Sequence, residues 1–403
     1  MPYIALHHAE RCRRCGACIE IVDCPGADES ICIGCRACVL ACPYQALELV
    51  EAQREREVTI EVNGKLFSVP ERISVKDALI KAGYPLAVSH GESGLFAPCE
   101  VGGCGSCAVE GDGVVKLACR TVARGGMKIR TDLRQGYIPR RIVMNFQGHS
   151  VGGVGTPRQS QDNDGAYLEA VCFTAGCNFR CPTCQNWPIT YLGQGEALTP
   201  QEAARRLTMV RKDLGLNRMT ISGGESTLNR TWLTLFLKEA RILNPDPDAR
   251  FHIDTNGSLL SHDFLDELVD AGMTDIGIDL KALETDTFIK ITGLSDRDLA
   301  ENYKETAWEA VRYLTHNYAG KVFVGVGIPY NRDFTSPSEI SRMGQRIFAI
   351  AHSLQVTVLN YRREFRSNIV QPKDTEMMAL RDILRDIGLK RVIVQTTAGN
   401  IGP

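Results

Sequence analysis

Long apolar segments, an excess of charge of one sign and an N-terminal leader pattern are all missing from this sequence of 403 residues. No apolar run approaches the ~18 residues that a transmembrane helix needs, so we expect no membrane partner. Lys and Arg total 46 against 48 Asp and Glu, which excludes a broad basic surface for nucleic acid. The start, Met1-Pro2-Tyr3-Ile4, soon meets charged residues rather than an apolar leader segment, so we predict a cytoplasmic protein. A hydrophobic content of 44% excludes disordered and fibrous classes.

Cysteine, by contrast, is abundant, with 16 residues. A disulfide framework suits small secreted chains, whereas clustered cysteines in a long cytoplasmic chain favour metal or redox sites. Fifteen of the cysteines fall into three spaced groups. The remaining one, Cys172, lies in an apolar strand and is predicted to be a buried core thiol.

The first group consists of two runs near the N-terminus. They read C-x2-C-x2-C-x5-C-P, ending Cys24-Pro25, and C-x2-C-x2-C-x3-C-P, ending Cys42-Pro43. The second run is the bacterial ferredoxin pattern for [4Fe–4S] clusters, in which the fourth cysteine serves the other cluster. This resemblance implies two ligand sets, Cys12, Cys15, Cys18 and Cys42, and Cys32, Cys35, Cys38 and Cys24. The alternative, two zinc sites, more often uses paired C-x2-C knuckles than tight triplets.

The second group has the plant-type [2Fe–2S] spacing C-x4-C-x2-C…C. Its members are Cys99, Cys104, Cys107 and Cys119. Upstream, an alternating strand over 58–62, the turn Asn63-Gly64, a strand over 66–69 and a helix over 75–82 capped by Ser74 are expected. Hairpin, helix and cysteine loop together resemble a β-grasp ferredoxin domain. A zinc knuckle is the alternative.

The third group, Cys177, Cys181 and Cys184, has the spacing C-x3-C-x2-C. Three thiolates can hold a [4Fe–4S] cluster and leave one iron without a protein ligand. An open coordination position is what separates a catalytic metal from a structural one.

The spacing divides the chain into three modules. Residues 1–50 form a small α+β module for two [4Fe–4S] clusters, residues 57–133 the β-grasp domain, and residues 134–166 a connector. Gly152-Gly153-Val154-Gly155 in the connector superficially suggests a phosphate loop, but it lacks the G-x-G-x-x-G frame and a preceding strand, so a linker is favoured.

Over 167–403, apolar strands alternate with amphipathic helices, for example one over 199–214. This predicts an α/β fold with a parallel sheet, arranged as a partial (β/α)6-type TIM barrel. The expected strands are 168–173, 218–222, 251–255, 275–280, 322–328, 357–360 and 391–395.

Polar motifs follow successive strands of this predicted sheet. They are the three-cysteine motif, Ser222-Gly223-Gly224-Glu225, Asp254-Thr255-Asn256-Gly257 and Asp279-Leu280-Lys281. Because α/β barrels keep their chemistry at the carboxyl ends of the strands, we expect these motifs to converge there. Turn, N-cap and salt-bridge roles are the alternative for each motif.

With these motifs, residues 167–400 resemble a radical S-adenosylmethionine (SAM) enzyme. The segment Cys181-Pro182-Thr183-Cys184-Gln185-Asn186-Trp187 and the three rim motifs resemble the pyruvate formate-lyase-activating type, especially its AmmeMemoRadiSam-system branch. The resemblance implies that the open iron is chelated by the amino and carboxylate groups of SAM. It also implies that one electron cleaves SAM into methionine and a 5′-deoxyadenosyl radical, which abstracts a hydrogen atom.

The resemblance implies catalytic roles for Cys177, Cys181 and Cys184. Glycines allow close backbone approach, and Glu225 is expected to accept a hydrogen bond from the SAM ammonium. Lys281 is expected to neutralise the methionine carboxylate. In activating enzymes, the acids that match Asp254 and Asp279 help to hold a monovalent cation, and the resemblance implies the same role here. The predicted cofactor-binding set is Gly223, Gly224, Glu225, Asp254, Thr255, Asn256, Asp279 and Lys281.

One position departs from the family pattern, since Thr183 stands where an aromatic residue usually packs near adenine. Phe179 and Trp187 are the candidate substitutes, with a core role as the alternative. A late loop carries Arg362, Arg363 and Arg366, which suit either a solvated surface or a contact to an anionic substrate.

The sequence thus predicts three [4Fe–4S] clusters, one [2Fe–2S] cluster and SAM as cofactors. Electrons from a low-potential donor are expected to pass inward through the ferredoxin modules, in an order that the sequence does not give. Outward transfer of electrons after substrate oxidation is the alternative. The activase resemblance implies a glycyl radical enzyme as partner. A small-molecule or peptide substrate is the alternative, and a non-catalytic electron-transfer or redox-sensor protein is an alternative of another class.

Overall fold

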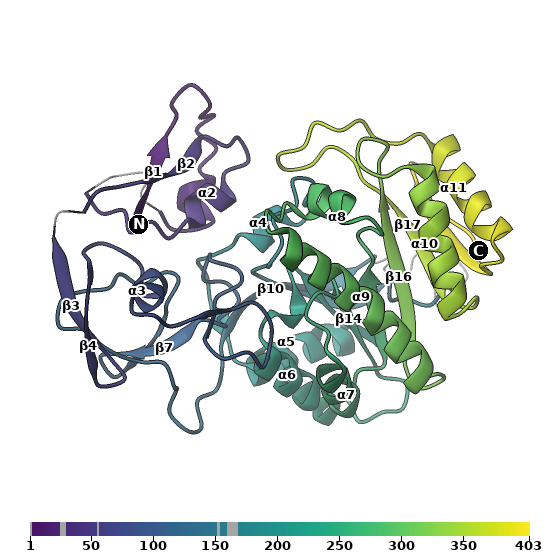
Figure 1. The fold of residues 1–403 in the computed structure, drawn as a ribbon. Coiled ribbons are helices and arrows are strands. Elements are labelled where there is room, and N and C mark those ends of the chain that lie inside the picture. The colour runs from purple at the N-terminus through teal and green to yellow at the C-terminus, as the bar shows by residue number, and fades with distance from the viewer. Residues whose placement is uncertain (1, 25–29, 55, 151–153, 159–167) are drawn as a thin grey trace. The chain divides into compact units, whose positions relative to one another are not determined.

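A computed structural model describes residues 2–24, 30–54, 56–150, 154–158 and 168–403 (Figure 1). The chain divides into two compact units. The first comprises Met1–Val143, Thr174–Asn178 and Asn186–Thr199, and the second comprises Met144–Phe173, Phe179–Gln185 and Pro200–Pro403. No helix in the described ranges is both long and apolar enough to cross a membrane.

The first unit begins with a small α+β module. Strands β1 (Tyr3–His7) and β2 (Leu47–Glu51) pair antiparallel and flank two short helices, α1 (Ala17–Glu20) and α2 (Ala37–Ala41). Each helix follows a left-handed residue, Gly16 or Arg36. Helix α2 ends where Cys42 turns extended, since a residue before proline is sterically barred from the helical region.

The β-grasp prediction is consistent with the second part of this unit. Its five-stranded sheet has the order β4-β3-β9-β7-β8, and Asn63 and Gly64 make the predicted turn with positive φ values of 49° and 82°. Ser74 caps the predicted helix, accepting a hydrogen bond of 3.0 Å from the Asp77 amide. The elements are β3 (Glu57–Val62), β4 (Lys65–Pro70), α3 (Val75–Lys81), β5 (Leu86–Ala87), β6 (Leu95–Phe96), β7 (Ala108–Gly111), β8 (Val114–Leu117) and β9 (Lys128–Arg130).

One expectation needs correction: the segment 134–166 is not a plain connector. It contains a nine-residue strand, β10 (Arg141–His149), whose start pairs antiparallel with β12 (Ala197–Leu198). The sequence hides this strand because its exposed positions are polar and Gly148 lowers its strand propensity. Gly152 and Gly153 lie outside the described residues.

All seven strands predicted over 167–403 are confirmed to within one residue at each end, except that β16 ends two residues later and β17 begins two residues earlier than predicted. The sheet order is β12-β10-β11-β13-β14-β15-β16-β17-β18-β19, and the pairings from β13 to β18 are parallel. The strands are β11 (Glu169–Thr174), β13 (Arg218–Gly223), β14 (Arg250–Thr255), β15 (Asp275–Asp279), β16 (Phe323–Tyr330), β17 (Gln355–Asn360), β18 (Arg391–Thr396) and β19 (Gly399–Ile401).

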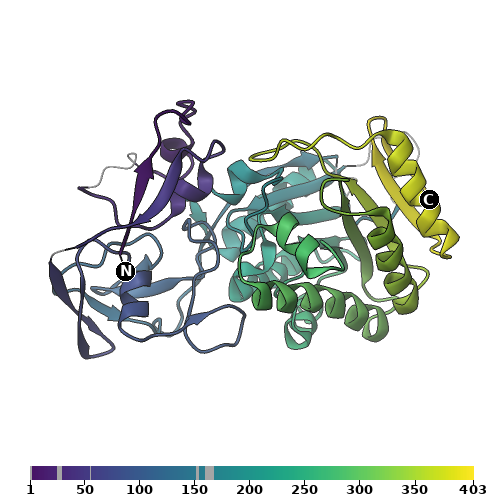
Figure 2. The ribbon, with the colours of Figure 1, turned by 45° about the horizontal axis from the view of Figure 1, so that its top comes forward.

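Helices of the second unit line the outer side of this sheet (Figures 1 and 2). Helix α5 begins at Pro200, as the sequence predicts. The helices are α5 (Pro200–Asp213), α6 (Arg230–Leu243), α7 (His262–Asp270), α8 (Thr285–Thr292), α9 (Arg297–Asn317), α10 (Pro337–Ile350) and α11 (Asp374–Asp386); a short α4 (Trp187–Thr190) belongs to the first unit.

The hydrogen bonds of Thr156 show that the sheet is strongly curved. Its hydroxyl donates to Glu169 Oε1 on β11 at 2.8 Å, and its carbonyl oxygen accepts from Gln355 Nε2 on β17 at 2.7 Å. These strands are five places apart in the sheet. In a flat sheet, with about 4.8 Å between strands, they would be separated by roughly 24 Å. The curvature therefore supports the predicted partial barrel.

The segment 154–158 fills the interior of this curved sheet near the first residues of the strands. Gln355 Oε1 accepts from the Arg158 amide at 2.8 Å, and Arg218 Nη2 donates to the Gly155 carbonyl at 3.3 Å. Arg218 also pairs with Glu169 at 2.8 Å and with Asp275 at 3.2 Å. The carboxylates and the guanidinium are all buried, so each compensates the desolvation of another.

Glycines on β15 and β16 make room for this segment, which yields a stability prediction. A methyl group added at Gly325 would overlap the Val154 carbonyl. We expect Gly325→Ala to lower the free energy of unfolding by about 1–3 kcal/mol through overpacking. Denaturant unfolding followed by circular dichroism measures it. Gly125→Ala is the control, since its nearest neighbours would lie at 3.7 Å, and equal effects of the two substitutions would contradict the packing described.

Candidate functional site

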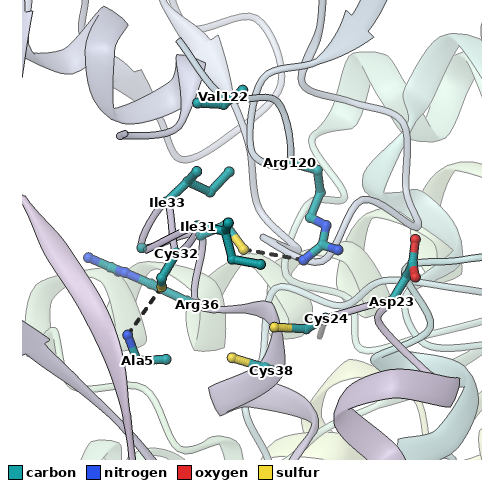
Figure 3. A pocket seen from close by; sticks show the side chains of 12 residues that line it. Ala5, Asp23, Cys24, Ile31, Cys32, Ile33, Arg36, Cys38, Arg120 and Val122 are labelled. Carbon is teal, nitrogen blue, oxygen red and sulfur yellow. Dashed lines mark hydrogen bonds between the residues drawn. The ribbon is translucent and has the colours of Figure 1, made fainter. Parts of the chain in front are cut away.

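The first unit contains a cavity of about 230 Å³ that is lined by four cysteines. Figure 3 shows their side chains with those of Arg36 and Arg120, which also line the cavity. The four are Cys24, Cys32, Cys35 and Cys38, which is the ligand set implied for one [4Fe–4S] cluster. Their thiols surround a space rather than converge at the distance of a single metal ion. The donor set and the space suit a cluster.

Cys24 lies close to cysteines of both runs. Hydrogen bonding with Cys24 and burial raise the pKa of Cys38 in the second run. Burial also raises the pKa of Cys18 in the first run, with the charges of Cys24, Cys15 and Cys42 adding to the effect. The exchange of the fourth cysteines between the two runs, and with it the ligand set Cys12, Cys15, Cys18 and Cys42, stays a prediction.

Backbone amides point at several of these sulfurs. Ala5 donates to Cys32 Sγ at 3.4 Å, Arg14 to Cys12 Sγ at 3.4 Å and Ala46 to Cys42 Sγ at 3.3 Å. Such donors stabilise thiolates, which are the form that binds iron.

The second group of cysteines is fully enclosed. Cys99, Cys104, Cys107 and Cys119 are each at most 1% exposed, and the Cys107 and Cys119 sulfurs are 3.3 Å apart. Hydrogen bonds from Cys104 and Cys119 lower the pKa of Cys99. The structure thus brings all four predicted ligands together, in a pocket suited to a small cluster.

The segment that carries Cys177 packs on this enclosed group within the first unit. A methyl group on Gly176 would lie 2.9 Å from Cys99 Cβ and 3.0 Å from Cys104 Cβ. The Gly176 amide donates to the Thr190 carbonyl at 3.0 Å, which fixes the segment. Gly176 also has a φ of 89°, so glycine is required there for both its backbone and its size.

Cys181 and Cys184 belong to the second unit, on a loop held from two sides. The Arg180 amide donates to the Thr292 carbonyl at the end of α8 at 2.7 Å, and the Arg366 amide donates to the Pro182 carbonyl at 3.0 Å. The loop with the late arginines therefore lies beside the cysteine loop. Arg362 and Arg363 are exposed, and Arg362 approaches Glu364 at 3.5 Å.

Glu225 has the N-cap role that the sequence analysis gave as the alternative for its motif, since its side chain caps the short 3-10 helix Ser226–Leu228. Its carboxylate is buried and accepts hydrogen bonds from the Thr227 amide at 3.0 Å and from the Thr227 and Thr255 hydroxyls at 2.6 Å. It also accepts from the Asn256 amide at 2.7 Å. Glu225 therefore ties the end of β13 to the end of β14. Its predicted contact with the SAM ammonium stays a prediction.

Lys281 forms a buried charged group with Asp279 and Tyr361. Lys281 Nζ donates to Asp279 Oδ2 at 2.6 Å and to the Tyr361 hydroxyl at 3.0 Å. Burial opposes the charge of Lys281, but Asp279, Tyr361 and Cys181 raise its pKa overall, so it stays protonated. In return, Lys281 partly offsets the burial that raises the pKa of Cys181 to about 12. Sequence reasoning missed Tyr361, whose only signal is its place directly after β17.

The remaining predicted residues lie at the same strand ends. Gly223 ends β13 with a φ of 115°, and Gly224 follows it. Asp254 near the end of β14 approaches His252 Nε2 at 3.0 Å. Asp254 and Glu169 raise the pKa of His252 to about 10 against the effect of burial.

Two further residues singled out in the sequence belong to the core. Cys172 is fully buried in β11, as predicted. Phe179 is 2% exposed and packs edge-on against Phe288, which is the core alternative for that residue.

Three family models match the chain. Residues 25–48 match a 4Fe-4S binding domain, residues 55–134 a 2Fe-2S iron-sulfur cluster binding domain, and residues 171–333 the radical SAM superfamily. Residues 171–333 are a radical SAM domain. It covers β11 to β16, and therefore the three-cysteine loop, Glu225, Asp254, Asp279 and Lys281, but not Tyr361.

Curated relatives match about a third of the chain. The GTP 3′,8-cyclase of Rhodopseudomonas palustris (strain TIE-1) is 31% identical over 129 residues, which are 32% of this chain and 37% of that protein. A probable GTP 3′,8-cyclase of Thermococcus kodakarensis is 30% identical over 145 residues, which are 36% and 44% of the two chains. The chain thus spans less than half the length of these relatives.

Two solved structures match part of the chain at low sequence identity. Streptococcus suis SuiB bound to S-adenosylmethionine has 18% identity and a TM-score of 0.39, covering 53% of this chain and 42% of that one. A radical SAM methyltransferase from Sphaerobacter thermophilus has 15% identity and a TM-score of 0.43, covering 57% and 67%.

The hydrogen bonds of Glu225 allow its two roles to be separated. Glu225→Gln replaces an acceptor with an amide group that faces donors, so we expect a loss of about 1–3 kcal/mol in unfolding free energy without SAM present. Thermal unfolding measures this, with Glu239→Gln on α6 as control. Unchanged stability together with weaker SAM binding would show that Glu225 acts as a cofactor contact instead.

Proposed function

We propose that this protein is a radical SAM enzyme that cleaves SAM reductively and abstracts a hydrogen atom from its substrate. The observation that carries the proposal is the open three-cysteine motif after β11, with a buried lysine beside Cys181. Cys177, Cys181 and Cys184 would hold the cluster. When bound, it supplies the electron that splits SAM into methionine and a 5′-deoxyadenosyl radical.

The residues around the motif position SAM and shield the reaction. Lys281 keeps a positive charge at the rim and is suited to the methionine carboxylate, with Asp279 and Tyr361 fixing its direction. Asp279, which is 28% exposed, and Asp254, which is 25% exposed, present carboxylate oxygens for a monovalent cation. Glu225 holds Thr255 and Asn256 in place, so their polar groups meet the cofactor without reorganisation.

The contacts of the first unit support an inward electron supply and suggest its order. Arg120, next to Cys119, contacts Cys35 of the cavity set. Gly176, next to Cys177, packs against Cys99 and Cys104 of the same β-grasp ligand region. This region therefore contacts both the eight-cysteine module and the segment of Cys177. We propose that electrons from a low-potential donor enter at the eight-cysteine module.

For the substrate, we propose an activating-enzyme role toward a glycyl radical partner, which rests on the Cys-Gln-Asn, Asp-Thr-Asn-Gly and Asp-Leu-Lys motifs. A peptide or small-molecule substrate is the second candidate. The exposed Arg362 and Arg363 favour an anionic group in either case. The similarity to GTP 3′,8-cyclases covers only about a third of this chain, so it carries no proposal for the substrate.

Removing one cysteine of the motif tests the site. In anaerobically reconstituted and reduced Cys177→Ala protein, we expect loss of 5′-deoxyadenosine formation and of about four of about fourteen iron atoms. Chromatography and iron analysis measure these quantities. Cys172→Ala, five residues away in β11, is the control and should keep both. Retained cleavage in Cys177→Ala would refute the assignment.

The substrate class is tested by stimulation of SAM cleavage. An anaerobic cell extract is split by ultrafiltration into a macromolecular and a small-molecule fraction, and each is added to the reduced protein. The activase proposal expects faster 5′-deoxyadenosine formation and a glycyl radical signal in electron paramagnetic resonance (EPR) with the macromolecular fraction. Stimulation confined to the small-molecule fraction would contradict it.

A further inference from the structure

Within the first unit, each ligand loop of the two ferredoxin-like modules sends one arginine side chain to the ligand loop of the other module. Arg120 directly follows Cys119, yet its Nη1 donates to Cys35 Sγ at 3.2 Å, and its Nη2 donates to the Val22 carbonyl. Figure 3 shows the guanidinium reaching toward the cavity from the β-grasp side. One side chain thus joins a predicted [2Fe–2S] ligand position to a sulfur of the [4Fe–4S] cavity.

A second contact runs in the opposite direction. Arg36 directly follows Cys35, and its Nη1 lies 3.5 Å from the carboxylate of Glu100, which directly follows Cys99. Lys76, whose side chain is 4% exposed, also pairs with Glu100. Two contacts, one made by Arg36 and one by Arg120, therefore hold the segment of Cys35 against the β-grasp ligand loop.

The charges at this junction add to a positive field. The negative charge of Glu100 is balanced by the positive charges of Arg36 and Lys76. The positive charge of Arg120 therefore acts on the Cys35 sulfur, to which it donates a hydrogen bond. Asp23, whose carboxylate lines the cavity, is exposed, so water screens its charge. Planar guanidinium is also less strongly hydrated than ammonium, which suits a contact with a polarisable sulfur.

A donor to a ligand sulfur stabilises the state of the group with more negative charge. In an iron–sulfur cluster that state is the reduced one, so hydrogen bonds and positive charge raise the reduction potential. We propose that Arg120 is a positioning residue that raises the potential of the cluster on Cys24, Cys32, Cys35 and Cys38 and keeps Cys35 facing the [2Fe–2S] loop. The proposal rests on the cluster assignment above and is independent of SAM cleavage.

The test is EPR-monitored potentiometry of the full-length reconstituted protein without SAM. Arg120→Gln keeps a polar side chain but removes the positive charge and the planar guanidinium with its two donating nitrogens. We expect the midpoint of one [4Fe–4S] signal to become more negative by a tenfold change in its reduction equilibrium, which is about 59 mV for one electron. The midpoint of the other [4Fe–4S] signal of the module should stay the same.

Two further variants keep the test decisive. Arg120→Lys retains the charge without the planar fork and should shift the same midpoint by less. Arg124→Gln, an exposed arginine four residues away, should shift nothing. An unchanged midpoint in Arg120→Gln with full iron content overturns the proposal. Loss of that cluster in both Arg120 variants also overturns it, since Arg120 would then be needed for assembly alone. Absent SAM cleavage with the expected midpoint shift would count against the proposed function only.

Discussion

The curvature of the parallel sheet is the constraint on which the second unit depends. Thr156 reaches β11 and β17 at once, so the strands wrap around the segment that contains it. Because β13, β14 and β15 are neighbouring parallel strands, the Glu225, Asp254 and Asp279 motifs at their carboxyl ends share one rim. The buried pairing of Arg218 with Glu169 and Asp275 stabilises the opposite end of the sheet. The parallel strand order thus places the candidate site, and the curvature encloses the connector at the other end.

In the first unit, the corresponding constraint is the close packing of ligand loops. Glycine at Gly176 lets the chain before Cys177 approach the enclosed cysteines, while Arg120 and Arg36 link the same loop region to the cavity. These contacts come from residues directly beside predicted ligands. Loops that are predicted to hold clusters thus also pack against one another, and a substitution beside a predicted ligand is expected to act on two sites.

Much of this organisation follows from the sequence because cysteine spacing and strand periodicity are local properties. The strands of the radical SAM domain, the Asn63-Gly64 turn and the Ser74 cap are fixed by neighbours in the chain. Strand β10 was not predicted, because its extended conformation depends on its partners in the sheet rather than on a pattern in its own residues. Glu225, Tyr361 and Arg120 act through residues 30 to 85 positions away, and no local signal announces such pairs.

The central claim is that an open cluster on Cys177, Cys181 and Cys184 turns a chain with two electron-supply modules into a SAM-cleaving enzyme. The most direct measurement combines the iron and sulfide content of the reconstituted wild-type protein with the 5′-deoxyadenosine it forms on reduction. The account predicts about fourteen iron atoms per chain and deoxyadenosine that appears only after a low-potential reductant is added. Fully loaded, reduced protein that forms no deoxyadenosine would contradict it.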